Sequence, residues 1–192
     1  MSAQQRRWVL SGGLASGKSL VRRFLHAHGV HTIDADAIGH EVLQSDGPAF
    51  SEVERRWPQV VEAGEVVRPS LAAIVFDDPE ELAALEAITH PHIFDRITAQ
   101  VEEVEGLVVV EIPVLRHSLG SDWRRIVVDS RDPLRLQRAI ERGMSPDDAR
   151  ARIAAQPTRS EWLAAADAVI PNHGDLSQLE EAVGRLWSGL AR

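Results

Sequence analysis

The residues with the clearest chemical potential lie in one short stretch, "GGLASGKSL", which runs from residue 12 to residue 20. Gly12, Gly17, Lys18 and Ser19 match the pattern G-x-x-x-x-G-K-[ST] of a phosphate-binding loop. The glycines let successive backbone N–H groups point inward, and a helix that starts at the lysine adds partial positive charge. The stretch therefore predicts a site for the phosphates of a nucleotide.

The lysine of this stretch is unusual for the chain. The sequence has 21 Lys and Arg side chains, and Lys18 is its one lysine. An ammonium group and a guanidinium group are not interchangeable beside a phosphate. A lysine kept only here favours a phosphate ligand over the alternative, a solvated lysine on a glycine-rich turn. We expect Lys18 to contact the outer phosphates and Ser19 to place its hydroxyl on Mg²⁺.

The asparagine content bears on which base the nucleotide can carry. The sequence contains one asparagine, Asn172, so it has no Asn-Lys-x-Asp motif of the kind that reads guanine. This argues against a GTPase switch.

Two carboxylates follow the second predicted strand. Asp34 and Asp36 stand in "IDAD", at the strand end where parallel sheets place their ligands. A carboxylate there can accept the proton of an attacking hydroxyl or help to hold a metal ion. The alternative for one of them is an N-cap of the helix that begins at "AIGHEV".

Arginines are concentrated in the third quarter of the chain. Arg135, Arg138 and Arg142 fall on one face of a predicted helix, and Arg150 and Arg152 follow it. Arginines on a mobile flap stabilise the charge that develops in phosphoryl transfer and exclude water. The alternative is a solvated helix face that pairs with neighbouring carboxylates.

The elements that must position these side chains follow from the apolar pattern. Five apolar runs predict strands, and helical patterns separate them: "RWVL", "VHTIDAD", "GLVVVEIP", "RRIVVDS" and "DAVIPN". Alternation of strands and helices predicts an α/β fold with a parallel sheet. Residues 48–104 have a helical pattern with no strand-like run, which predicts a helical insertion between the second and third strands. Ser145 and Pro146 predict the N-cap and first residue of a later helix.

Composition sets the broad class. The chain has 192 residues, of which 44% are hydrophobic, and its net charge is −8. We expect one domain, no nucleic-acid partner, because that needs a basic surface, and no membrane span, because no long apolar run occurs. The chain has no cysteine and no predicted signal peptide. We expect a cytoplasmic protein that is a monomer or a weak homo-oligomer.

Beyond the loop, an ordered set of motifs resembles the dephospho-coenzyme A kinase family. The resemblance spans about residues 8 to 187, nearly the whole chain. It rests on "SGGLASGKS", "IDADAIGHEV", "GPAF", "LAAIVFDDPEELAALEAITHPHI", "VVVEIPVL", "QRAIERG", "RIAAQ" and "ADAVIPN".

The resemblance implies a P-loop kinase fold with three parts. These are a core at about 6–47, 105–140 and 157–192, a helical acceptor-binding region at about 48–104, and a small helical lid at about 141–156. It implies ATP and Mg²⁺ as cofactors, and phosphorylation of the ribose 3′-hydroxyl of dephospho-CoA.

Site residues carry over by position. The resemblance implies catalytic roles for Asp36, Lys18 and Arg142. The implied ATP site consists of Gly13, Leu14, Ala15, Ser16, Gly17, Lys18, Ser19, Leu20, Arg138 and Asn172, with Ser19 also on the metal. The implied acceptor site consists of Asp34, Arg68, His90, Pro113, Leu115, Arg152 and Gln156.

The chain also departs from the family pattern. Ala15 and Leu20 stand where Gly and Thr are common, and Ala63-Gly64 replaces an acidic pair before Arg68. Arg116 and His117 stand where the family usually has a large apolar residue and Glu. Two alternatives therefore stay open: another P-loop kinase of a nucleoside or sugar, and an ATP-binding regulatory module without catalysis.

Overall fold

The molecule was analysed as a computed structural model that describes residues 6–112, 119–120 and 122–190. The chain divides into two compact units. A sheet unit contains residues up to 33 and from 104 onward, and a helical unit contains residues 34–103. The phosphate-binding loop belongs to the sheet unit.

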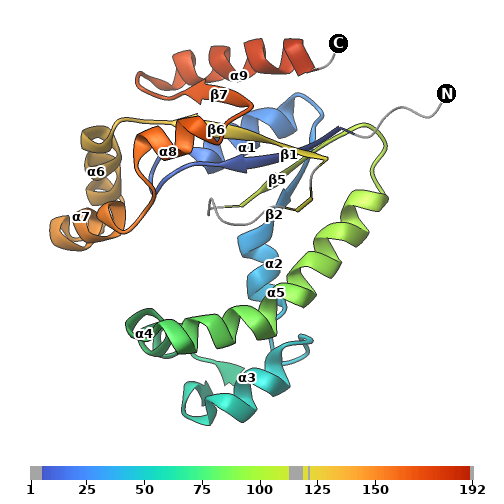
Figure 1. Ribbon diagram of the computed structural model, residues 1–192, viewed down its shortest axis with the longest axis vertical. Helices are drawn as coiled ribbons and strands as arrows, with labels where there is room; N and C mark the ends of the chain where they lie inside the picture. Colours follow the sequence, from blue (N-terminus) through green and yellow to red (C-terminus); the bar gives the residue numbers. More distant parts are fainter. Residues whose placement is uncertain (1–5, 113–118, 121, 191–192) are drawn as a thin grey trace. The chain divides into compact units, whose positions relative to one another are not determined.

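A five-stranded parallel sheet forms the centre of the sheet unit, in the order β2-β5-β1-β6-β7 (Figure 1). Its strands are β1 (Arg6–Ser11), β2 (His31–Asp34), β5 (Leu107–Glu111), β6 (Trp123–Asp129) and β7 (Ala168–Pro171). All five predicted strands, and the predicted α/β class, are confirmed. Because β1 lies in the middle, consecutive residues Trp8, Val9 and Leu10 are all buried, as expected for a strand covered on both faces.

Five described helices belong to the sheet unit: α1 (Lys18–Ala27), α6 (Asp132–Glu141), α7 (Pro146–Ala154), α8 (Arg159–Ala164) and α9 (Leu176–Leu190). Helices α1 and α9 pack together over one face of the sheet, where Leu10, Val21 and Val183 share a core (Figure 1). The predicted cap of α7 is confirmed, since the Ser145 side chain accepts the Asp148 N–H at 3.2 Å. Helix α8 was not predicted.

The helical unit contains α2 (Ala35–Glu41), α3 (Phe50–Arg56), the short 3-10 helix η1 (Pro58–Val60), α4 (Arg68–Asp77) and α5 (Pro79–Glu102). Its core is built from Val53, Trp57 and Leu71, with apolar side chains of α5 packed against them. The Trp57 indole N–H donates to Glu81 Oε2 at 2.7 Å, which satisfies the polar atom of this buried ring.

The expectation that no strand interrupts residues 48–104 is wrong. Strands β3 (Val61–Glu62) and β4 (Glu65–Val66) form a small antiparallel hairpin. Its two-residue turn has Ala63 at φ 51° and Gly64 at φ 81°, the left-handed pair that a tight hairpin turn requires. Two strands of two residues each are too short to give an alternating apolar pattern.

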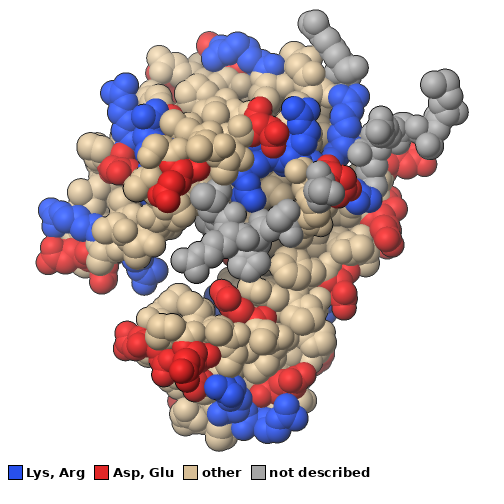
Figure 2. Space-filling view, in the orientation of Figure 1, with Lys and Arg blue, Asp and Glu red and all other residues tan. Residues whose placement is uncertain are grey.

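Charged side chains of both signs lie near one another on each unit, as the face in Figure 2 shows. Arg56 pairs with Glu81 at 3.0 Å and Arg96 pairs with Glu41 at 2.7 Å in the helical unit. None of the described helices combines the length and apolar character needed to cross a bilayer.

Candidate active site

The phosphate-binding loop joins β1 to α1, which confirms the predicted strand–loop–helix context. The loop curls at Gly13, whose carbonyl accepts the Ser16 N–H at 3.2 Å. Three of its residues have positive φ, namely Gly12 at 150°, Ala15 at 55° and Gly17 at 103°. Gly17 is also the N-cap of α1, so the positive end of that helix faces the loop.

The glycines of the loop leave no room for a side chain. A Cβ atom at Gly12 would lie 2.8 Å from both Ser16 Oγ and the Val128 carbonyl oxygen. A Cβ atom at Gly17 would run into the Asn172 side-chain amide. Both glycines of the pattern are therefore required for two reasons. Their backbone conformation favours glycine, and the loop packs closely against Val128 of β6 and against Asn172, which follows β7.

The Lys18 side chain folds back over the loop. Its Nζ atom donates to the Gly12 carbonyl at 2.9 Å and to the Gly13 carbonyl at 3.2 Å. The ammonium group is therefore held against the first two residues of the loop, and phosphate oxygens would compete with the two carbonyl groups for it.

A carboxylate stands beside the loop serine. Glu111, the last residue of β5, is 7% exposed, and its Oε1 lies 3.5 Å from Ser19 Oγ. Its other oxygen accepts the Arg22 Nε–H at 2.7 Å. Strands β1 and β5 are paired, with Leu10 opposite Glu111, and this register carries the carboxylate to the base of the loop.

Asn172, which directly follows the edge strand β7, connects the loop to Arg138 on α6. Asn172 is 4% exposed, and its side-chain amide donates to the Ser16 carbonyl at 2.7 Å. Arg138 donates to the Asn172 side-chain oxygen at 3.1 Å and to its backbone carbonyl at 3.3 Å. Burial, followed by the charge of nearby Arg142, lowers the pKa of Arg138 below its usual range.

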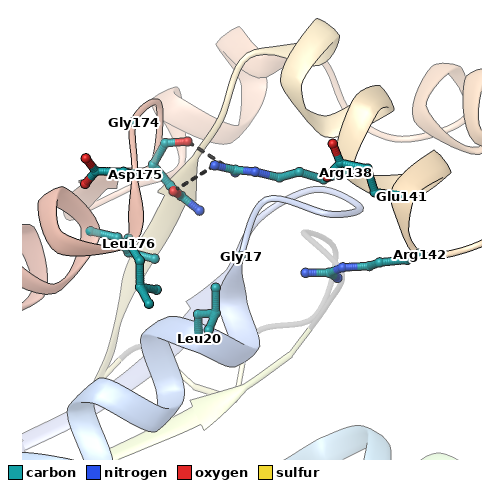
Figure 3. Close-up of a pocket in the computed structure, with 10 residues that line it drawn as sticks. Gly17, Leu20, Arg138, Glu141, Arg142, Gly174, Asp175 and Leu176 are labelled. Atoms are coloured by element: carbon teal, nitrogen blue, oxygen red, sulfur yellow. Dashed lines mark hydrogen bonds between the residues drawn. The ribbon is translucent and has the colours of Figure 1, made fainter.

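A pocket of about 240 Å³ opens beside this contact (Figure 3). Arg138, Glu141 and Arg142 line it from α6 and its C-cap, and Leu176 and Leu179 line it from α9. Gly17 and Leu20 complete the wall on the side of the loop. The pocket therefore combines apolar side chains with two guanidinium groups directly next to the phosphate-binding loop.

Asp129, the last residue of β6, is the centre of a second polar cluster. Arg159 on α8 binds both of its carboxylate oxygens, at 2.7 and 2.6 Å, and His173 Nε2 lies 3.2 Å away. The hydrogen bond from Arg159 is the main reason that the pKa of Asp129 lies below its usual range, against the opposing effect of burial. This cluster holds α8 and the β7–α9 loop to the end of β6.

In the helical unit, Asp34 caps α2. Its Oδ1 accepts the N–H groups of Asp36 at 3.1 Å and Ala37 at 3.2 Å. The N-cap alternative is therefore confirmed for Asp34, whereas the Asp36 side chain is exposed in the first turn of the helix. His90 lies on α5 with its ring 5.6 Å from that of Phe94.

Arg68 begins α4 and lines a separate pocket of about 420 Å³ in the helical unit. His40, Asp46 and Glu65 contribute to the same pocket. Its lining therefore carries side chains of both signs of charge, with Leu43 and Val66 as its apolar members.

Comparison with known proteins decides the family. The family model described as dephospho-CoA kinase matches residues 8–178 of the chain. The chain belongs to the dephospho-CoA kinase family. The dephospho-CoA kinase of Streptomyces avermitilis is 40% identical in an alignment of 189 positions that covers 94% of this chain and 92% of that protein. That of Leifsonia xyli is 39% identical over 94% of this chain and 96% of its own length.

Solved structures agree with the family. A protein of Thermus thermophilus superposes with a TM-score of 0.85 at 30% identity, covering 99% of each chain. The dephospho-CoA kinase of Campylobacter jejuni superposes with a TM-score of 0.66 at 26% identity, covering 98% of each chain. Shikimate kinase from Bacteroides thetaiotaomicron, at 16% identity and a TM-score of 0.55, shares the fold. The chain is thus an ATP-dependent transferase with a P-loop kinase fold.

The structure of this family member brings many of the expected site residues together. Gly17 and Leu20 of the loop line the pocket of Figure 3 together with Arg138, Arg142 and Asn172. The Ser16 carbonyl of the loop accepts a hydrogen bond from the Asn172 side-chain amide. Gln156 contacts the loop through the Leu14 N–H at 2.8 Å. Arg152 is exposed on α7 and lines none of the pockets described above, and Pro113 and Leu115 lie outside the described residues.

Glu111 is the residue beside the loop that sequence analysis missed. A signal was present, because "VVVE" is a buried strand that ends in an acid next to the loop strand. Among the described residues, no three His, Cys, Asp or Glu side chains come together to hold a metal ion. One hydroxyl and one nearby carboxylate suit Mg²⁺, which takes oxygen ligands, keeps several waters and binds substrate phosphates.

Proposed function

We propose that this enzyme transfers the γ-phosphoryl group of ATP to the ribose 3′-hydroxyl of dephospho-CoA, giving CoA and ADP. The observation that carries the proposal is the match of the family model to residues 8–178, which include the intact loop with Lys18 and Ser19. In this reaction the 3′-oxygen bonds to the γ-phosphorus, and the bond from that phosphorus to the β–γ bridging oxygen breaks.

The loop residues would bind the phosphates. Backbone N–H groups at the start of α1 and the Lys18 ammonium group supply positive charge to the β- and γ-phosphates. Lys18 is supported in this role by its position over the Gly12 and Gly13 carbonyls, from which it can turn to a phosphate oxygen. The pocket of Figure 3 would take the nucleoside end of ATP, with Arg138 and Asn172 beside it.

Ser19 would hold Mg²⁺ directly, and Glu111 would hold one of its waters. The 3.5 Å separation of the two side chains and the oxygen character of both donors support this assignment. When bound, Mg²⁺ neutralises charge on the β- and γ-phosphates.

The acceptor would be bound mainly by residues that the family resemblance points to. Asp36 would orient the 3′-hydroxyl and accept its proton as the new bond forms. Asp34, Arg68, His90, Arg152 and Gln156 complete the proposed acceptor site, with Pro113 and Leu115 by position in the sequence. Arg142 would stabilise the charge on the transferring group.

A single reaction tests the proposal. The purified chain is incubated with ATP, Mg²⁺ and dephospho-CoA, and ADP and CoA are followed by mass spectrometry, with Lys18→Ala as the control. We expect CoA from the native chain and its loss in the variant. Transfer to a nucleoside or sugar in an acceptor panel, with no CoA, would identify a different small-molecule kinase. ATP binding without any transfer would identify a regulatory module.

A further inference from the structure

Arg135 is a charged side chain that is almost completely buried beside the phosphate-binding loop. It lies in the first half of α6, and only 3% of it is exposed. The reaction described above gives it no role. A guanidinium group loses much hydration free energy when buried, so it is retained where several acceptors surround it.

The acceptors of Arg135 connect it to the loop. Its Nε atom donates to the Leu14 carbonyl at 3.0 Å, and Nη2 donates to Gln156 Oε1 at 2.5 Å. The remaining nitrogen, Nη1, donates to Asp132 Oδ1 at 2.8 Å. Arg135 is thus bound to Leu14, which is 121 residues earlier in the sequence, and to Gln156, which is 21 residues later.

The same contacts hold both polar backbone groups of one loop residue. Leu14 donates its N–H to Gln156 Oε1 at 2.8 Å, and its carbonyl accepts from Arg135. Leu14 immediately precedes Ala15, the residue held at φ 55°. Fixing both peptide planes around Leu14 constrains the turn that aims the following N–H groups inward.

Arg135 also fills the space over the preceding glycine. A Cβ atom added at Gly13 would overlap the Arg135 guanidinium group, approaching it more closely than Cβ atoms approach any neighbour in proteins. Because three hydrogen bonds hold that guanidinium group, it cannot move aside without losing some of them.

We propose that Arg135 is a positioning residue for ATP, which acts with Gln156 to preset the conformation of the phosphate-binding loop. A loop that is already ordered binds phosphate without the cost of ordering it on binding. The proposal rests on ATP binding at the loop and is independent of the acceptor.

The test compares Arg135→Met with Arg131→Met. Methionine keeps the length of the buried side chain and removes its donors, and Arg131 is exposed at the start of the same helix. Three quantities are measured for each variant: the Kd of Mg²⁺-ATP by calorimetry, the melting temperature, and hydrogen exchange of peptides that cover residues 11–20.

We expect Arg135→Met to weaken ATP binding about tenfold, equivalent to roughly 1.4 kcal/mol, and to speed exchange in the loop peptides. Arg131→Met should leave both unchanged. Arg135→Lys should recover part of the affinity, because the ammonium group can still donate to some of the same acceptors. A Kd within about twofold of the native value, or a lower melting temperature with loop exchange and Kd unchanged, would overturn the proposal and leave Arg135 a structural residue.

A second comparison keeps the proposal testable if Arg135→Met folds poorly. Gly13→Ala should displace the guanidinium group and weaken ATP binding, whereas Gly13→Ala combined with Arg135→Ala should bind ATP no more weakly than Gly13→Ala alone. Additive losses in the double variant would show that the two positions act independently and would contradict the coupling.

Discussion

At the residue scale, Asp34 and Asp36 have different surroundings although they are two positions apart. Asp34 accepts hydrogen bonds from two backbone N–H groups and is therefore the N-cap of α2. Capping by one oxygen of Asp34 fixes the first turn of the helix, and that turn carries the exposed Asp36. The proposed proton acceptor is thus mounted on a well-defined backbone.

For Asp36, we predict that Asp36→Asn lowers kcat by about 10²–10⁴-fold. The amide keeps the shape of the side chain but cannot accept the hydroxyl proton. ATP affinity should stay within about twofold, since this residue does not belong to the phosphate-binding loop. Steady-state kinetics with ATP and dephospho-CoA checks this, and an unchanged kcat would remove Asp36 from the mechanism.

For Glu111, we predict a change in metal dependence. Glu111→Gln removes the charge beside Ser19 and should raise the Mg²⁺ concentration needed for half-maximal ATP binding about tenfold. Calorimetric titration of ATP at several Mg²⁺ concentrations measures this without the acceptor. If the Mg²⁺ dependence does not move, the carboxylate has a structural role only, through its contacts with Ser19 and with Arg22.

At the scale of elements, the sheet could be predicted because its strands carry their own signal. Both β1 and β5 contain three consecutive buried apolar residues, at 8–10 and 108–110, as expected for strands covered on both faces. The sequence analysis did not predict helix α8 or the β3–β4 hairpin, for different reasons. The helix is only six residues long, and the hairpin depends on backbone conformation at Ala63 and Gly64.

The hairpin turn gives a prediction of its own. Ala63 is held at φ 51°, a conformation that is unfavourable for alanine and tolerated by asparagine. Ala63→Asn should raise the free energy of unfolding by about 0.5–1 kcal/mol. Gly64→Ala should lower it by about 1 kcal/mol, and through backbone strain alone, since a Cβ atom there has nothing within 4 Å. Urea denaturation of both variants checks the two signs, and a stabilising Gly64→Ala would contradict the assigned turn.

At the scale of the whole molecule, contacts between segments that are distant in sequence complete the site. The loop could be predicted from local spacing, as could its serine and lysine. Asn172 was expected at the ATP site from the family resemblance. The contacts of Glu111 and Arg135 with the loop could not be predicted, because they form only after the strands and helices have assembled. A polar residue at the end of a strand, such as Glu111, indicates a candidate partner, but the sequence does not specify which atoms form hydrogen bonds.

The Asp129 cluster predicts how stability responds to pH. Pairing with Arg159 depresses the pKa of Asp129 in the folded state, so its stabilising contribution is complete above the unfolded pKa, near 4. It is lost as the pH falls through the lower pKa of the folded state. Arg159→Gln should lower the free energy of unfolding at pH 7, and the difference from the native chain should shrink below about pH 4.

Urea denaturation across the range from pH 3 to pH 7 measures this difference, with His173 left in place as the second partner of Asp129. Arg185→Gln is the matched control, because Arg185 pairs with Glu181 at 3.6 Å on an exposed helix face. It should change the free energy of unfolding by less than about 0.5 kcal/mol at every pH. A difference for Arg159→Gln that does not vary with pH would contradict the role of the Asp129 carboxylate.

The folded-back Lys18 side chain has a practical consequence. A protease that cleaves only after lysine has one target in the whole chain, and that target is the loop residue whose ammonium group rests on the Gly12 and Gly13 carbonyls. Cutting there requires the loop and the first turn of α1 to open, so the rate of a single cleavage reports opening of the nucleotide site. We expect saturating Mg²⁺-ATP to slow this cleavage at least tenfold, since at 100 times its Kd a ligand stabilises the closed form by about 2.7 kcal/mol.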